Sequence, residues 1–174
     1  IEFIQGDFAK AVRESQEGSE RIRHIVQDLR DFSHKDTGDR ERADVNHCVD
    51  STASIVWTMM KHSVVLDKDY HDIPLVSCYP MQIKQVLMNL LVNAYQAIET
   101  RLAEGADPAP GHILIRTQRC GEGVSIDVHD NGVGIADGDR SRIFDPFFTT
   151  KEVGAGTGLG LSTSYNIIQR HGGT

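Results

Sequence analysis

Two asparagines, Asn89 and Asn93, lie four positions apart in a segment rich in apolar residues. In a helix, this spacing puts both side chains on one face, one turn apart. Amide oxygens bind Mg²⁺ and water without adding charge to the site. The pair is therefore a candidate metal site, although on its own the simpler interpretation is two amides on a helix surface.

A second candidate segment is Asp130-Asn-Gly132-Val-Gly134, which follows an alternating, strand-like run. A carboxylate at this place can accept a hydrogen bond from the amino group of a flat base, and the glycines let the base approach the backbone closely. Taken alone, the same residues would also make an ordinary turn.

A third segment, Gly154–Leu161, holds four glycines and runs directly into an amphipathic stretch. A glycine loop that opens a helix points backbone N–H groups at phosphate, although a flexible linker has the same composition. The third segment begins 20 residues after Gly134. Chance does not account well for all three segments in this order.

Other nucleotide and catalytic signatures are missing from the sequence. There is no G-x-x-x-x-G-K-[ST], H-E-x-x-H, G-x-S-x-G or H-R-D pattern. The third glycine of a dinucleotide fingerprint would fall on Leu159 or Leu161, and no strand directly precedes the loop. P-loop and dinucleotide-binding folds are therefore excluded.

The elements that would position these segments can be predicted from periodicity. We expect helices at 50–62, 81–104 and 161–170, short strands at 64–66 and 75–78, and a hairpin of strands 113–117 and 124–128. Asp50 or Ser51 would cap the first of these helices. Helices mixed with a partly antiparallel sheet predict an α+β fold, a two-layer α/β sandwich.

A heptad pattern over residues 1–34 predicts a long N-terminal helix, and the charged residues 35–43 predict a linker. That helix either packs on its own domain or forms half of a dimerising hairpin. The regularity of the seam favours the hairpin.

The 174 residues carry a net charge of −7, with no apolar run long enough to span a bilayer. These values argue against a nucleic-acid partner and against a membrane segment in this chain. Three dispersed cysteines predict reduced thiols in the cytoplasm rather than disulfides or a zinc site.

At this point the chain resembles the sensor histidine kinases. Residues 89–93, 130–134 and 154–161 look like the N box and the two glycine boxes of that family, and 144–151 like its phenylalanine box. The resemblance covers nearly all of 44–174. It implies the Bergerat ATP-binding sandwich, shared with gyrase-type topoisomerases, mismatch-repair ATPases and the ninety-kilodalton heat-shock chaperone. Residues 21–34 are similar to the second helix of the dimerisation hairpin.

The resemblance implies ATP and Mg²⁺ as ligands. Asn93 would bind the metal, with Asn89 and Lys151 as catalytic residues beside it. Asp130 would bind the adenine amino group. The other implied nucleotide-binding residues are Gly132, Gly134, Ile135, Thr150, Gly156, Thr157, Gly158, Leu159, Gly160 and Leu161. Residues 136–155 would form the ATP lid.

The resemblance also separates kinase from hydrolase. The ATPase relatives carry a water-activating glutamate four residues before the metal-binding asparagine, and here that residue is Asn89, which cannot act as a base. The implied function is transfer of the γ-phosphoryl of Mg-ATP to a histidine, for relay to a response-regulator aspartate. The alternatives are a Bergerat-fold ATPase and a non-catalytic nucleotide-binding scaffold.

The chain departs from the family in one important respect, because no H-E-x-x-x-P acceptor motif is present. His24 lies off the helix seam and reads as a surface residue. We therefore expect a catalytic domain without its acceptor helix and terminal strand. The expected partners are the acceptor helix of the full-length protein, a response-regulator receiver domain, and a second copy bound through the N-terminal helix.

Overall fold

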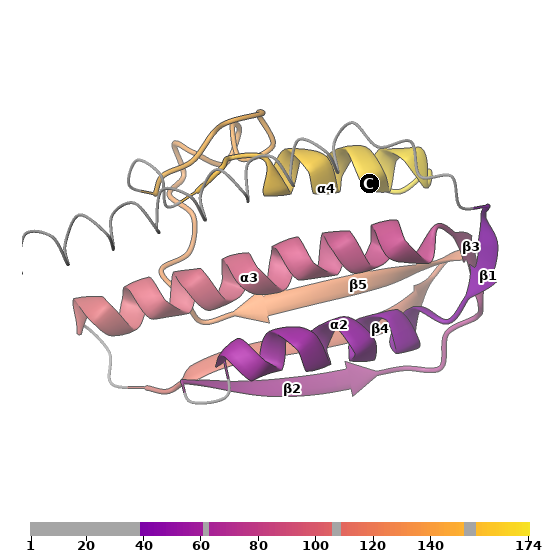
Figure 1. Cartoon of the computed structure of the whole chain (residues 1–174), viewed down its shortest axis with the longest axis horizontal. Coiled ribbons are helices and arrows are strands. Elements are labelled where there is room, and N and C mark those ends of the chain that lie inside the picture. Colours follow the sequence, from indigo (N-terminus) through magenta and orange to yellow (C-terminus); the bar gives the residue numbers. More distant parts are fainter. Residues whose placement is uncertain (1–38, 61–62, 106–108, 152–155) are drawn as a thin grey trace, which may run out of the picture.

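The computed structural model describes residues 39–60, 63–105, 109–151 and 156–174. The predicted helix at 1–34 and the first part of the predicted linker lie outside these ranges. The elements are β1 (Glu41–Ala43), α2 (Val45–Met60), β2 (Val64–Tyr70), β3 (Val76–Cys78), α3 (Pro80–Glu104), β4 (Gly111–Cys120), β5 (Gly123–Asp130) and α4 (Gly160–Arg170). Figure 1 shows α3 between α2 and α4, in front of the sheet.

The predicted α+β sandwich is confirmed. One sheet has the strand order β2-β4-β5, and β1 pairs with β3 in a separate two-stranded sheet. β2 runs parallel to β4, with Val64 opposite Gly111. β4 and β5 form the predicted antiparallel hairpin, which closes where Cys120 pairs with Gly123. β5 therefore ends at Asp130, at the end of the hairpin opposite its turn.

The hydrophobic core lies between the sheet and the helices. Alternate residues of β4 point into it, and Ile113 and Ile115 are fully buried. Facing them are fully buried residues of α2 and α3, namely Val49, Val56, Met60, Leu87, Leu91 and Ile98. The other side of the sheet is polar, where Arg116 pairs with Asp69 at 2.7 Å. The sheet therefore has one buried and one solvated face, as expected of a two-layer fold.

Some predicted boundaries were wrong. α2 begins at Val45 rather than near residue 50, because Asp44 caps it: its Oδ1 accepts the backbone N–H groups of Asn46 and His47 at 2.9 and 3.3 Å. The last three residues of the predicted linker form β1, whose partner β3 lies over 30 positions along the chain. β2 extends to Tyr70 through its pairing with β4.

The predicted end of α3 is confirmed. The helix stops at Glu104, and Gly105 adopts the left-handed conformation at its C-terminus. In the last turn, Arg101 is buried and its Nη2 donates to the carbonyl oxygens of Ala109 and Pro110 at 2.9 and 3.3 Å. The end of α3 is thereby tied to the start of β4.

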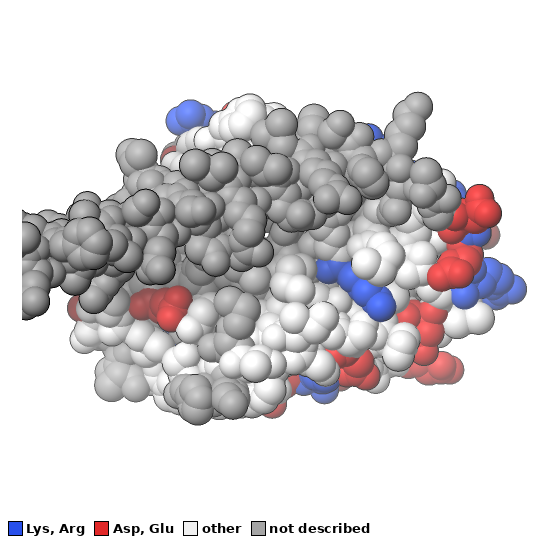
Figure 2. All heavy atoms as spheres, viewed as in Figure 1, with Lys and Arg blue, Asp and Glu red and all other residues white. Residues whose placement is uncertain are grey.

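Charged side chains of both signs and three cysteines are distributed over the described part of the chain. Figure 2 shows acidic and basic side chains intermixed around the end that holds β1 and β3. Among the described residues, none of the helices has the length and apolarity that a membrane span requires. Cys48, Cys78 and Cys120 are free, and burial raises the pKa of the first two.

Replacing the core residue Leu91 with alanine should lower the free energy of unfolding by about 2–5 kcal/mol, because it leaves a cavity under α3. Leu91 is fully buried, whereas Met81 on the same helix is 68% exposed. Met81→Ala is the matched control and should change stability by less than about 0.5 kcal/mol. Urea denaturation followed by circular dichroism measures both. Equal effects of the two substitutions would contradict the described packing of α3.

Candidate functional site

The candidate site is organised along one face of α3. Asn89, Asn93 and Ala97 follow one another at intervals of four residues, so they form a row along this face. Each contacts a different segment from the C-terminal half of the chain. These segments are the start of α4, Lys151 in the residues before it, and the turn after β5.

Asn89 contacts the first turn of α4. Its Nδ2 donates to the carbonyl oxygen of Gly160 at 3.0 Å and lies 3.2 Å from Ser164 Oγ. Ser164 Oγ in turn donates to the Gly160 carbonyl at 2.9 Å. The amide N–H groups of Asn89 are therefore used to hold the start of α4 against α3.

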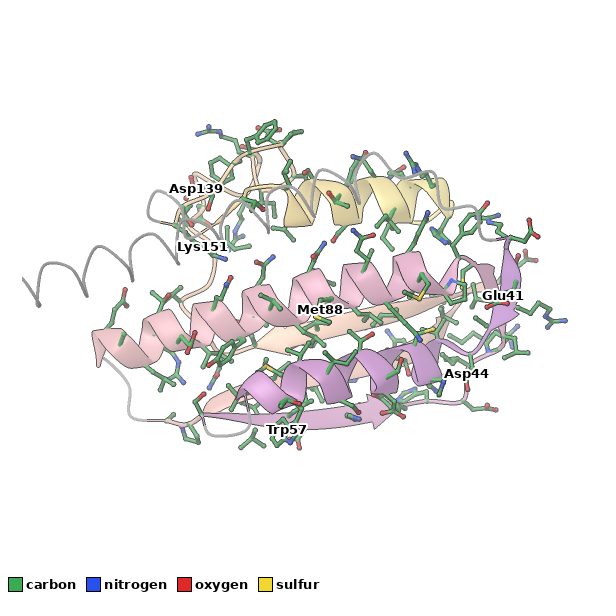
Figure 3. All side chains as sticks on the ribbon, in the orientation of Figure 1. Glu41, Asp44, Trp57, Met88, Asp139 and Lys151 are labelled. Carbon is green, nitrogen blue, oxygen red and sulfur yellow. The ribbon has the colours of Figure 1, made fainter. Side chains whose placement is uncertain are left out.

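Asn93, one turn further on, faces a lysine. Lys151 Nζ lies 3.4 Å from Asn93 Oδ1 and donates a hydrogen bond to Gln96 Oε1. Figure 3 shows Lys151 between the segment that precedes α4 and the helix α3. Partial loss of solvent around the ammonium lowers the pKa of Lys151. Two neutral side-chain oxygens of α3 thus already face a cation.

The carboxylate of Asp130 is oriented by the turn that follows β5. Its Oδ1 accepts the backbone N–H of Gly132 at 2.9 Å. Within the described ranges no hydrogen bond is made to its second oxygen, and the residue is exposed. Asp130 therefore presents one fixed, accessible acceptor.

Asn131 was missed by the sequence analysis, yet it anchors this turn. Its Oδ1 accepts the backbone N–H of His112 at 2.8 Å, and its Nδ2 donates to the Pro110 carbonyl at 3.0 Å. Its own N–H donates to the His112 carbonyl at 3.2 Å. Asparagine directly after a strand is a residue type that favours turns, and this is the signal that could have drawn attention to it.

The same turn crosses α3 at close range. A Cβ on Gly132 would lie 2.5 Å from Ala97 Cβ and 2.6 Å from the Ala97 carbonyl carbon. Val133 N–H donates to the Ala97 carbonyl at 3.2 Å. No side chain fits at Gly132. The small residues Gly132 and Ala97 therefore set the distance between Asp130 and the row of Asn89, Asn93 and Ala97 on α3.

The glycine segment before α4 is joined to the aromatic segment upstream of it. Phe147 N–H donates to the Gly158 carbonyl at 2.9 Å. Gly158 has φ +67°, and a Cβ there would lie 2.3 Å from the Phe147 carbonyl carbon. Phe147 itself has φ 67° and is 69% exposed. This close approach gives Gly158 a steric role besides the one expected from phosphate binding.

The remaining predicted site residues lie in the turn after β5, in the residues before α4 and at the start of α4. Ile135 and Thr150 are exposed, and Gly134 lies in the turn after β5. Thr157 Oγ1 accepts the Leu159 N–H at 3.4 Å, and Leu159 is buried at the start of α4. Gly156 approaches Thr149, whereas Leu161 is half-buried in the first turn of α4. Residues 152–155 of the predicted lid lie outside the described ranges.

The charges at the start of α4 and at Lys151 favour the binding of an anion. The positive end of the α4 dipole lies at Gly160, and the first turn of that helix has no acidic residue. Lys151 adds a full positive charge beside Asn93. In the described part of the chain no three His, Cys, Asp or Glu side chains gather as metal ligands. The amide oxygen of Asn93 stays the metal ligand predicted from the sequence.

The chain is similar in sequence to a known protein family and to several curated relatives. Residues 78–174 match the family described as histidine kinase-, DNA gyrase B- and HSP90-like ATPases. Sensor histidine kinase ZraS of Escherichia coli K12 is 42% identical over 102 residues, covering 59% of this chain and 20% of ZraS. Signal transduction histidine-protein kinase AtoS of the same strain is 34% identical over 155 residues, covering 87% of this chain and 24% of AtoS. The chain thus spans about a fifth to a quarter of these relatives.

Solved structures share the fold. The nucleotide-free catalytic domain of histidine kinase ThkA is 29% identical, with a TM-score of 0.62 over 77% of this chain and 82% of that one. ThkA in complex with response regulator protein TrrA gives a TM-score of 0.70 at 24% identity, and the match covers 94% of this chain and 45% of that one. ShkA in complex with AMPPNP gives a TM-score of 0.70 at 20% identity, and the match covers 94% of this chain and 33% of ShkA. The last two support the fold alone.

The family match covers more than half of the chain and includes the Asn89–Ala97 row, the turn after β5 and the glycine segment. The chain therefore belongs to the histidine kinase-, DNA gyrase B- and HSP90-like ATPase family, and it carries a catalytic domain of the sensor histidine kinase type.

Proposed function

We propose that this domain binds Mg-ATP along the Asn89–Asn93–Ala97 row of α3 and transfers the γ-phosphoryl group to a histidine. The supporting observation is that this row brings together a base acceptor, two amide oxygens facing a cation, and a helix N-terminus. The relatives and solved structures named as histidine kinases support the same activity.

At the base end, we assign the adenine amino group to Asp130. The Gly132 N–H fixes one carboxylate oxygen, so the carboxylate is held before the ligand arrives. Asn131 holds the turn to β4 through its bonds to His112 and Pro110. ShkA, which shares this fold, has been solved in complex with AMPPNP, an analogue of ATP.

At the phosphate end, the residues fit Mg²⁺. Asn93 Oδ1 and Gln96 Oε1 already face the ammonium of Lys151, and such neutral oxygens are suitable for a hard cation that keeps phosphate and water as its other ligands. When bound, the metal supplies neutralisation of the triphosphate charge. Lys151 and the α4 N-terminus add positive potential for the phosphate oxygens.

Phosphoryl transfer is favoured over hydrolysis by the environment of Asn89. Its amide N–H groups are donated to Gly160 and Ser164, and an amide cannot remove a proton from water. We therefore assign Asn89 as a positioning residue for α4. The rival function, an ATPase that drives a conformational clamp, would need another base at this place.

We further propose that the acceptor histidine belongs to a dimerisation hairpin in the full-length protein and that residues 1–34 form part of this hairpin. An aspartate of a receiver domain would then take the phosphoryl group in the cytoplasm. ThkA, which shares this fold, has been solved in complex with a protein of this class, response regulator protein TrrA.

The transfer itself is tested by incubating the chain with γ-labelled ATP, Mg²⁺ and a separately supplied hairpin that carries an acceptor histidine. The proposal predicts acid-labile label on the hairpin and little free phosphate. Steady release of free phosphate without label on the hairpin would contradict it and favour the ATPase.

Asp130→Asn keeps an oxygen for the Gly132 N–H but removes the charge that strengthens the bond to the base. ATP affinity measured by calorimetry should fall at least about tenfold, the magnitude of a charge-assisted hydrogen bond. Asp127→Asn is the control, because Asp127 lies on the same strand with its side chain on the opposite face. Unchanged affinity in folded Asp130→Asn would refute the assignment to adenine.

Asn93→Ala removes the amide oxygen that we assign to the metal. The gain in ATP affinity on adding Mg²⁺ should fall at least about tenfold, as is typical when support for a metal site is lost. Affinity measured in EDTA should change much less. Asn166→Ala, an exposed change on α4, should leave both values as they are. If Asn93→Ala kept the full Mg²⁺ effect, the metal would have to bind elsewhere.

A further inference from the structure

The end of α4 that lies away from the glycine segment is held by a histidine. His171 follows the last residue of α4, and its Nε2 accepts the backbone N–H of Tyr79 at 3.0 Å. Tyr79 is the N-cap residue of α3, and its own side chain makes no capping hydrogen bond. The two rings meet edge to face, with centroids 5.5 Å apart.

The second ring nitrogen of His171 determines which tautomer this contact needs. Nδ1 lies 2.8 Å from the carbonyl oxygen of Ile167, which can only accept. Nδ1 must therefore carry the proton, which leaves the Nε2 lone pair for the Tyr79 N–H. Each nitrogen has one partner with the matching role, so the ring is locked in place.

An arginine from the start of the described chain lies at the same place. Arg40 Nη2 donates to the carbonyl oxygen of Arg170 at 3.3 Å, and its guanidinium lies 5.7 Å from the centre of the Tyr79 ring. Arg40 directly precedes β1, which pairs with β3. A cation at the C-terminus of α4 is favoured by the helix dipole.

These contacts attach α4 to α3 at both ends. Asn89 holds the first turn of α4, and Tyr79, ten residues earlier on α3, holds its end through His171. The two helices are therefore antiparallel, and ten residues of α3 extend about as far as the 11 residues of α4, about 15 Å. Since Gly160 both opens α4 and ends the glycine segment, the orientation of α4 sets the position of that segment.

We propose that His171 is a positioning residue for nucleotide binding: it fixes the axis of α4 against α3, and thereby holds residues 156–160 of the glycine segment in their binding-competent place beside Asn89. This inference rests on the proposed function. Without the bond to Tyr79, this end of α4 would keep only the contacts of Arg40 with the Arg170 carbonyl and the Tyr79 ring, and a smaller fraction of molecules would be competent. Apparent affinity falls in proportion to that fraction.

His171→Phe keeps a ring of similar size but cannot accept the Tyr79 N–H. Affinity for AMPPNP with Mg²⁺, measured by calorimetry, should fall about three- to tenfold, the range expected from the loss of one hydrogen bond. His171→Gln can offer an amide oxygen to the Tyr79 N–H and should restore affinity to within about twofold of wild type. His47→Phe, at an exposed position on α2, is the control and should bind as wild type does.

The thermal midpoint of each variant is measured in parallel. A lower midpoint for His171→Phe with unchanged affinity would show a purely structural role and overturn the proposal. The same conclusion would follow if His171→Gln bound as weakly as His171→Phe. If the wild type itself bound no AMPPNP, the proposed function would fail rather than the role of His171.

Nitrogen NMR of the wild-type chain tests the inference without any variant. The proposal predicts that His171 is neutral with its proton on Nδ1 and that Nε2 shows a coupling or shift typical of an acceptor. A proton on Nε2 in the neutral ring would overturn it, because the Tyr79 N–H would then have no lone pair to bond.

Discussion

The arrangement of the site depends on one face of α3. Residues at 89, 93 and 97 are one turn apart, and each holds a different segment: the start of α4, Lys151 and the turn that carries Asp130. The helix can serve in this way because its opposite side is anchored in the core by Leu87, Leu91 and Ile98. A rigid, buried helix therefore positions side chains and loops that are themselves exposed.

The glycines of the site act through close packing as well as through exposed N–H groups. Gly132 touches Ala97 and Gly158 touches the backbone of Phe147, at distances that leave no room for a side chain. The first contact brings a loop onto a helix residue that is distant in sequence, and the second closes the segment that precedes α4 on itself. The ligand-binding role that we propose for these glycines is thus combined with a packing role in the same residues.

Periodicity was enough to predict α3, its end at Gly105 and the β4–β5 hairpin, because these depend on local patterns. The start of α2 and strand β1 were not found: the Asp44 cap resembles other polar residues nearby, and β1 is a strand only through pairing with β3. The residues that we propose for the site stand out in the sequence by type and spacing. The contacts of Gln96 with Lys151 and of His171 with Tyr79 join positions over 50 residues apart, so no local pattern reveals them.

The central claim is that three separate segments form one nucleotide site along α3. Amide NMR shifts measured during titration with AMPPNP and Mg²⁺ test it most directly. The account predicts that the amide signals of Asn93, Gly132 and Gly158 shift together with one common affinity. The signals of Ser125 and Asp127, on the opposite face of the sheet, should not change. Shifts confined to one of the three segments, or different affinities for each, would contradict a single site.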